Sequence, residues 1–151
     1  MLQYPDTKTN REETCMSSER KLLLTTRIPV RWGDMDAYGH VNNTVYFRYF
    51  EQARVEWLES MDFAVSPERA EAPVIINASC TFLMPVNYPA TVEVRLYAGE
   101  PGRSSVMTWY ELRVEGDDRL YAEGAAKVVW MDMRTGRSVA LPDTLRTVFD
   151  Q

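Results

Sequence analysis

The chain has 151 residues, 45% of them hydrophobic, and a formal net charge of −5 at pH 7. This length fits one domain with a single hydrophobic core, and the 17 Lys and Arg residues are scattered, which gives nucleic acid no basic surface to bind. Cys15 and Cys80 do not make a disulfide framework and suit a reducing cytosol.

The N-terminal part of the chain is not expected to enter a membrane. No uncharged apolar stretch approaches the roughly 18 residues that a membrane span needs, and the first residues lack the apolar middle region of a signal peptide. Residues 1–20 are polar and without period, so we expect a flexible extension followed by a single domain over residues 21–151. These features predict a cytoplasmic protein with neither a membrane nor a nucleic-acid partner.

The first regular elements are a strand and a long helix. In residues 22–32 an apolar run turns into alternation, with Ile28, Val30 and Trp32 on one face, which is typical of a strand. The segment 44–61 is apolar at positions 46, 50, 53, 57 and 61, the spacing of one helical face, and has no proline or glycine. Its first two turns, TVYFRYF, are apolar almost all round, so we expect other elements to enclose them.

Four strands and a short helix are predicted after the long helix. A loop at 66–73 leads into alternating apolar and polar residues within 76–82, 92–96, 106–114 and 120–130. Turn signals separate these segments at 85–90, 99–104 and 115–119, and such short links favour antiparallel neighbours. Pro142 and Asp143 can begin a helix within 141–149. The predicted class is α+β, with an antiparallel sheet of about five strands covering one long helix.

Polar residues are concentrated just ahead of the long helix, in the segment RWGDMDAYGHVNN at 31–43. It holds two carboxylates, the only histidine of the chain, two glycines and two asparagines. The first N–H groups of a helix are unpaired and lie at its positive end, so a helix start can stabilise an oxyanion. A carboxylate on a loop that folds back across that start could attack the same carbonyl carbon or activate water.

The sequence RWGDMDAYGHVNNTVYFRYFEQARVEWL resembles the signature region of the hotdog-fold acyl thioesterases, the 4-hydroxybenzoyl-CoA thioesterase-like superfamily. The resemblance extends over roughly residues 22–149. It implies a sheet wrapped around a central helix, subunits that pair through their sheets as a homodimer or homotetramer, and active sites between two subunits. It also implies hydrolysis of an acyl thioester, carried by coenzyme A or by acyl carrier protein, without a cofactor or a metal ion.

The resemblance assigns roles to two residues of this segment and draws attention to a third. Asp36 matches the catalytic carboxylate of the family, which serves either as nucleophile or as general base. Asn43 matches the position whose amide polarises the thioester carbonyl. Plant acyl-carrier-protein thioesterases are similar through D-x-N-x-H-V-N-N, and this chain keeps the histidine as His40 but has Tyr38 in place of the first asparagine.

Two further groups of residues are candidates outside the segment. Arg103, Ser104 and Ser105 resemble the place where relatives hold the pantetheine and phosphates of coenzyme A, and a plain polar turn explains them equally well. Glu51 is the reserve catalytic residue, because some hotdog relatives use a helix glutamate, although such acids are usually solvated or paired with a cation.

Several residues of the segment also have simpler interpretations. Asp34 is expected to be structural. Asp34, Asp36 and His40 could in principle hold a hard metal ion, but three close ligands without a distant fourth give poor support for a dedicated site. His40 could assist Asp36, orient substrate or only bond the loop, and the side chains of Asn42 and Asn43 are good helix caps.

The predicted function is hydrolysis of an acyl thioester, with Asp36 as base or nucleophile and the Asn43 amide polarising the carbonyl. The alternative is a non-catalytic module that binds or senses acyl thioesters on the same fold, because a fold does not by itself imply a function. A dehydratase of related fold would pair a histidine with a carboxylate differently, and only one histidine is available.

Overall fold

The computed structural model describes residues 19–63 and 67–150. The elements in chain order are β1 (Lys21–Pro29), η1 (Trp32–Asp34), α1 (Asn43–Ser60), β2 (Glu71–Phe82), β3 (Thr91–Ala98), β4 (Ser105–Val114), β5 (Asp117–Asp132), β6 (Arg137–Ser138) and α2 (Asp143–Thr147). The predicted extension therefore lies outside the described residues as far as position 18. No helix in the described ranges is both long and apolar enough to cross a membrane.

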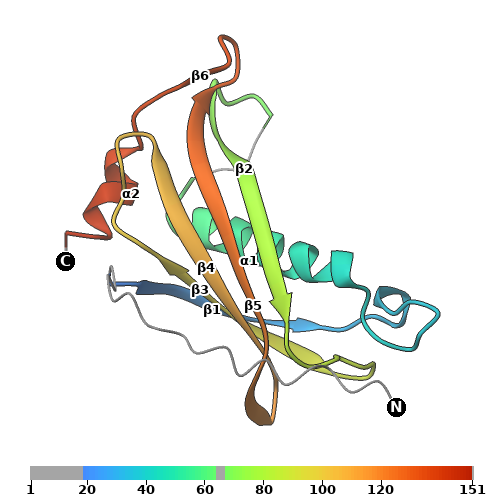
Figure 1. Cartoon of the computed structure of the whole chain (residues 1–151). Helices are drawn as coiled ribbons and strands as arrows, with labels where there is room; N and C mark the ends of the chain where they lie inside the picture. The colour runs from blue at the N-terminus through green and yellow to red at the C-terminus, as the bar shows by residue number, and fades with distance from the viewer. Residues whose placement is uncertain (1–18, 64–66, 151) are drawn as a thin grey trace.

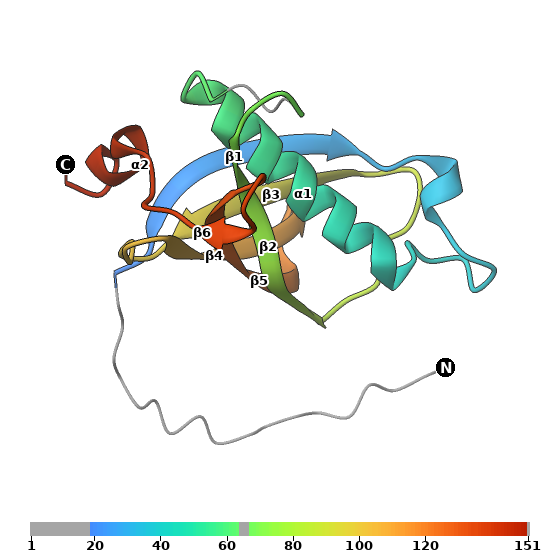
Figure 2. The same cartoon turned by 90° about the horizontal axis from the view of Figure 1, so that it is seen from above.

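The strands form one antiparallel sheet in the order β1-β3-β4-β5-β2, with the short β6 paired to β5. The sheet curls around α1, which lies along its concave side (Figures 1 and 2). This arrangement confirms the predicted α+β class and the hotdog fold. The helix begins at Asn43 and ends at Ser60, close to the predicted range 44–61.

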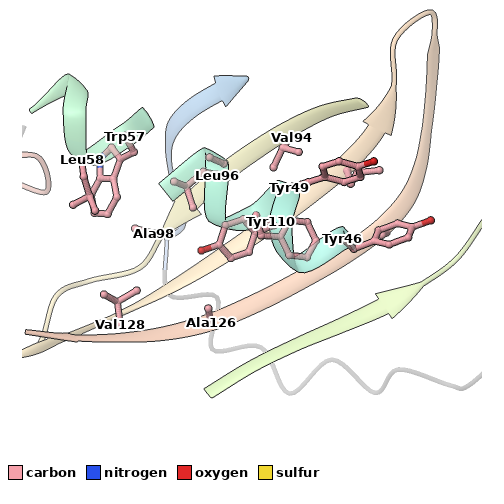
Figure 3. Packing of buried hydrophobic residues seen from close by; sticks show 14 of the residues in the cluster. Tyr46, Tyr49, Trp57, Leu58, Val94, Leu96, Ala98, Tyr110, Ala126 and Val128 are labelled. Atoms are coloured by element: carbon pink, nitrogen blue, oxygen red, sulfur yellow. The ribbon is translucent and has the colours of Figure 1, made fainter. Parts of the chain in front are cut away.

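The core fills the space between α1 and the concave face of the sheet. Every second residue of β3 is buried, as the strand period requires, and α1 buries Tyr46, Tyr49, Phe50, Ala53, Trp57 and Leu58. Phe50 stacks on Tyr110 of β4 with ring centroids 4.6 Å apart, and Figure 3 shows the rings of α1 directed at the strands. The aromatic first turns of α1 are thus held by the sheet, which fixes where the helix starts.

The link between β2 and β3 is not the hairpin that its turn signals suggested. β3 pairs with β1 and β4, whereas β2 lies at the far edge of the sheet beside β5. The linking segment therefore crosses the end of the sheet, where Met84 N–H donates to the Tyr121 carbonyl at 3.1 Å and Val86 accepts from Val41 N–H at 2.8 Å. This crossing places the segment against the loop that precedes α1.

Two predicted boundaries were wrong. The first strand ends at Pro29 and not at residue 32, and Trp32 lies in η1 with 74% of its surface exposed. The predicted loop 66–73 is too long, because β2 begins at Glu71 and includes Pro73. Proline is tolerated there because β2 is an edge strand, so the N–H that proline lacks is not needed by a second neighbour.

Candidate active site

The loop between η1 and α1 is folded back on itself by backbone hydrogen bonds. Asp36 N–H donates to the His40 carbonyl at 2.9 Å, and Gly39 N–H donates to the Asp36 carbonyl at 3.0 Å. Gly39 has φ of 81°, a left-handed conformation that favours glycine. Met35 and Val41 form an isolated antiparallel bridge at the base of the loop. The loop is therefore a closed turn that returns the chain to the start of α1.

A cleft of about 660 Å³ opens beside this loop and the start of α1. Its polar residues come from the loop and the helix start, and its apolar wall comes from α1, the end of β2 and the β2–β3 link. The lining residues are Asp36, Tyr38, His40, Val41, Asn43, Tyr46, Phe82, Met84 and Pro85. The structure thus brings Asp36, His40 and Asn43 together in one cleft. Met84 and Pro85 were not predicted from the sequence as site residues, and they reach the cleft because the link crosses the end of the sheet.

The Asp36 carboxylate is half-buried and oriented by two donors. Its Oδ1 accepts from Tyr38 N–H at 2.9 Å, and its Oδ2 accepts from Asn42 Nδ2 at 3.3 Å. Each carboxylate oxygen has two lone pairs, so both can still accept a further hydrogen bond. The carboxylate is therefore fixed in place yet able to accept a proton.

Asn43 is the first residue of α1, and its backbone N–H faces no acceptor within the described residues. The neighbouring N–H groups are all occupied: Val41 bonds Val86, Asn42 bonds the Asp34 carbonyl at 2.9 Å, and Thr44 bonds Asn42 Oδ1 at 2.9 Å. An unpaired N–H at the positive end of an 18-residue helix is a donor suited to a negatively charged oxygen.

His40 is exposed at the mouth of the cleft. Its carbonyl holds the Asp36 N–H, whereas its imidazole makes no hydrogen bond within the part of the chain that the structure describes. The ring is thus available to a ligand and is not joined to the Asp36 carboxylate.

Asp34 serves the structure of the loop. Its Oδ2 accepts from Tyr49 OH at 2.8 Å and from Arg31 N–H at 2.9 Å. Burial, together with the hydrogen bond to the Asp34 carboxylate, raises the pKa of Tyr49 well above its ordinary value, because both disfavour the phenolate. These bonds agree with the structural role expected of Asp34.

The other candidates lie away from the cleft. Asp36 follows the end of β1 that pairs with Thr91, whereas Ser105 lies at the opposite end of the strands. The turn at 102–105 is tied to the C-terminal segment, since Arg146 Nη2 donates to the Arg103 carbonyl at 2.7 Å and Leu141 N–H donates to the same oxygen at 2.9 Å. Within one chain, Arg103, Ser104 and Ser105 therefore do not share a site with Asp36.

Glu51 also points elsewhere. It is exposed and pairs with Arg48 at 3.0 Å, about 12 Å along the helix axis from Asn43 at a rise of about 1.5 Å per residue. No group of three or more His, Cys, Asp or Glu side chains within residues 19–63 and 67–150 is placed to hold a metal ion.

Residues 30–149 match the family model of the thioesterase-like superfamily. The chain belongs to the thioesterase-like superfamily. It is 26% identical to the long-chain acyl-CoA thioesterase FadM of Escherichia coli (strain K12), over 85% of this chain and 98% of that protein. Membership of this superfamily supports thioester hydrolysis as its general activity.

Solved structures of the superfamily share the fold. PA2801 of Pseudomonas aeruginosa, a provisionally assigned thioesterase, is 47% identical with a TM-score of 0.83, and the match covers 85% of this chain and 99% of that chain. XC229 of Xanthomonas campestris, provisionally assigned as an acyl-CoA thioesterase, is 36% identical with a TM-score of 0.68, over 75% of this chain and 96% of that chain.

The Tyr49–Asp34 bond predicts a pH dependence of stability. A tyrosine whose pKa is raised on folding keeps its proton where the unfolded chain has lost it, so stability falls as the pH rises above about 10, by up to about 1.4 kcal/mol per pH unit. We expect Tyr49→Phe to show a smaller alkaline fall in the free energy of unfolding, measured by urea denaturation between pH 8 and 11. Tyr38→Phe, at an 89% exposed tyrosine, should keep the wild-type slope. If the free energy of unfolding fell equally with pH in the wild type and both variants, Tyr49 would not be the group responsible for the alkaline loss of stability.

Proposed function

We propose that the protein hydrolyses acyl thioesters in the cleft beside α1, with Asp36 as general base or nucleophile and the backbone N–H of Asn43 holding the carbonyl oxygen. The observation that carries this proposal is that one cleft is lined by both Asn43, whose N–H is unpaired among the described residues, and Asp36, whose carboxylate is held by two donors. An electrophilic carbonyl placed between them would meet a donor on its oxygen and a carboxylate near its carbon.

The chemistry follows from the charge that develops. In the general-base route, water attacks the carbonyl carbon while Asp36 takes its proton, and the negative charge on the carbonyl oxygen is stabilised by the Asn43 N–H and the helix dipole. The C–S bond then breaks and the thiolate receives the proton from Asp36. In the nucleophilic route, the Asp36 carboxylate attacks the carbonyl carbon, the C–S bond breaks and the thiolate leaves. Water then hydrolyses the acyl anhydride, which restores the Asp36 carboxylate, releases the acid and supplies the proton that the thiolate takes up.

The proposed substrates are acyl thioesters of coenzyme A, with acyl carrier protein as the second carrier. FadM is a long-chain acyl-CoA thioesterase, and the apolar wall of Tyr46, Phe82, Met84 and Pro85 suits the acyl group. His40, exposed beside Asp36, is proposed to assist proton transfer or to contact the thioester. The free thiol of Cys80 suits a reducing compartment, and we place the reaction in the cytoplasm.

The proposed assembly is a homodimer, or a pair of such dimers, joined through the open edge of β2. None of the twelve residues of β2 is buried, although it is one of the longest strands of the sheet. An open edge with exposed apolar residues is a liability that pairing with a second copy removes. A two-fold axis perpendicular to the sheet would make the two β2 strands antiparallel, so opposite ends of the two subunits would lie together.

This assembly gives Arg103, Ser104 and Ser105 a proposed role. In one chain they lie at the opposite end of the strands from Asp36. Antiparallel pairing of β2 would bring the 103–105 turn of the second subunit to the end that carries Asp36, where it could hold the pantetheine or phosphates of coenzyme A. The backbone bonds of this turn would remain intact, because they use carbonyl groups.

Asp36→Asn tests the chemical step. The substitution keeps the volume and removes the negative charge, so turnover of acyl-CoA should fall by at least about 100-fold while acyl-CoA binding and the thermal midpoint change little. Release of free thiol measures turnover over short, long and aromatic acyl-CoAs, and calorimetry measures binding. His40→Ala is the comparison: an equally large loss of turnover would indicate that His40 and Asp36 act together in the chemical step. A wild-type protein that binds acyl-CoA without hydrolysing it would instead be the non-catalytic module.

Asn43→Pro tests the donor. Proline is well tolerated at the first position of a helix, and Asn42 already has the extended backbone, ψ 140°, that a following proline requires. Loss of the N–H should lower kcat by about 100-fold or more, the usual effect of removing one oxyanion donor. Asn43→Ala keeps the N–H and should retain wild-type turnover. Comparable activity in the proline and alanine variants would rule out this donor.

Ile76→Glu tests the dimer. Ile76 is 55% exposed on β2, and a glutamate there would bring its charge into the proposed contact with the second copy. We expect this variant to be monomeric by light scattering at micromolar concentration, whereas the wild type has at least twice the monomer mass. Leu22→Glu, at a 50% exposed leucine on the opposite edge strand β1, should keep the wild-type mass. A monomeric wild type with full activity would refute the assembly.

A further inference from the structure

The side chain of Asn42 bonds both the Asp36 carboxylate and the first turn of α1. Its Oδ1 accepts from Thr44 N–H at 2.9 Å and from Thr44 Oγ1 at 2.7 Å, and its Nδ2 donates to Asp36 Oδ2 at 3.3 Å. Since the oxygen faces two donors, the orientation of the amide is fixed, and the nitrogen is the atom that faces Asp36. The backbone N–H of Asn42 donates to the Asp34 carbonyl at 2.9 Å, which holds the residue itself.

Helix capping alone does not explain this pattern. Serine, threonine and aspartate cap helices about as well as asparagine, yet aspartate has no donor and a hydroxyl has only one oxygen for both tasks. A carboxamide carries its acceptor and its donor on separate atoms of one rigid plane. Asn42 can therefore cap α1 and bind the Asp36 carboxylate at the same time.

We infer that Asn42 is a positioning residue for the reaction: its side chain fixes the Asp36 carboxylate relative to the open N–H of Asn43, one residue along the chain. The inference rests on the proposed function of Asp36 and Asn43. It assigns to Asn42 a role that a cap does not have, because a carboxylate and an oxyanion donor act on the same carbonyl group only at a set separation.

Two donors hold the Asp36 carboxylate beside the cleft, the Tyr38 N–H and the Asn42 amide. The other titratable groups that line the cleft are Tyr38 and His40 on the same loop and Tyr46 on α1, while the segment from the end of β2 supplies only apolar side chains. Among the described residues no lysine or arginine lines the cleft, so the side-chain bond that holds the carboxylate comes from the neutral Asn42 amide and not from a cation.

Three variants separate the two roles of Asn42. Asn42→Ser and Asn42→Asp keep a capping oxygen and remove the amide donor, and Asn42→Asp also adds a like charge beside Asp36. Thr44→Val is the control, because it removes the hydroxyl bond to Asn42 Oδ1 without touching Asp36. We expect Asn42→Ser to keep the wild-type thermal midpoint and KM within about twofold, with kcat about 10-fold lower. Asn42→Asp, which places a second carboxylate beside Asp36, should lose at least as much kcat.

A double-substitution cycle tests whether Asn42 acts through Asp36. In the Asp36→Asn background, Asn42→Ser should lower kcat no further, because the carboxylate that it positions is already absent. A further loss of kcat there, or Asn42 variants with kcat within about twofold of wild type, would overturn the role of Asn42 alone if Asp36→Asn has lost the expected activity. An active Asp36→Asn would instead overturn the proposed function, and the positioning role with it.

Discussion

The hydrogen bonds that join the 36–42 loop to the first turn of α1 determine where a substrate carbonyl could be held. The loop is closed by the bond from Asp36 N–H to His40, and its last residues are tied to the Asp34 carbonyl and to Val86. Each bond connects a different piece of backbone: the loop itself, η1, and the link between β2 and β3. The same three backbone hydrogen bonds therefore hold both the start of α1 and the loop that carries the Asp36 carboxylate, so the two are fixed relative to each other.

Packing in the hydrophobic core also fixes the start of α1, because the end of a helix is held in place only if the rest of the helix is. Phe50 stacks on Tyr110 and lies so close to Gly124 that a Cβ there would come within 2.4 Å of the Phe50 ring. Tyr46 packs against Phe82 at 4.9 Å between ring centroids, where β2 ends at the cleft. The aromatic residues of TVYFRYF thus have two effects: they fill the sheet's concave side, and they hold the helix start at the edge of that core.

Local patterns in the sequence predicted the helices and strands, whereas the pairing of distant strands could be seen only in the structure. Periodicity found α1 to within a residue at each end. The composition of the 31–43 segment and its resemblance to the family singled out Asp36, His40 and Asn43, which are neighbours in the chain. Periodicity misassigned Trp32, since alternation continues past the end of β1 while the chain turns into η1. Periodicity does not show which strands pair, so it could not predict that β2 lies beside β5 and not β3. The positions of Met84 and Pro85 in the cleft depend on that pairing and were therefore not predicted.

The location of Arg103, Ser104 and Ser105 follows from the same limit. The sequence of a turn between two strands does not indicate at which end of the sheet the turn lies. The strand register places the 103–105 turn at the end opposite to Asp36. The residues proposed for bond cleavage, Asp36 and Asn43, lie in one chain. The residues proposed to bind the pantetheine or phosphates of coenzyme A, in the 103–105 turn, would have to come from a second copy. On the proposed dimer, a variant that weakens the β2 edge should raise KM for acyl-CoA more than it lowers kcat, because Asp36 and Asn43 stay together in each separated subunit.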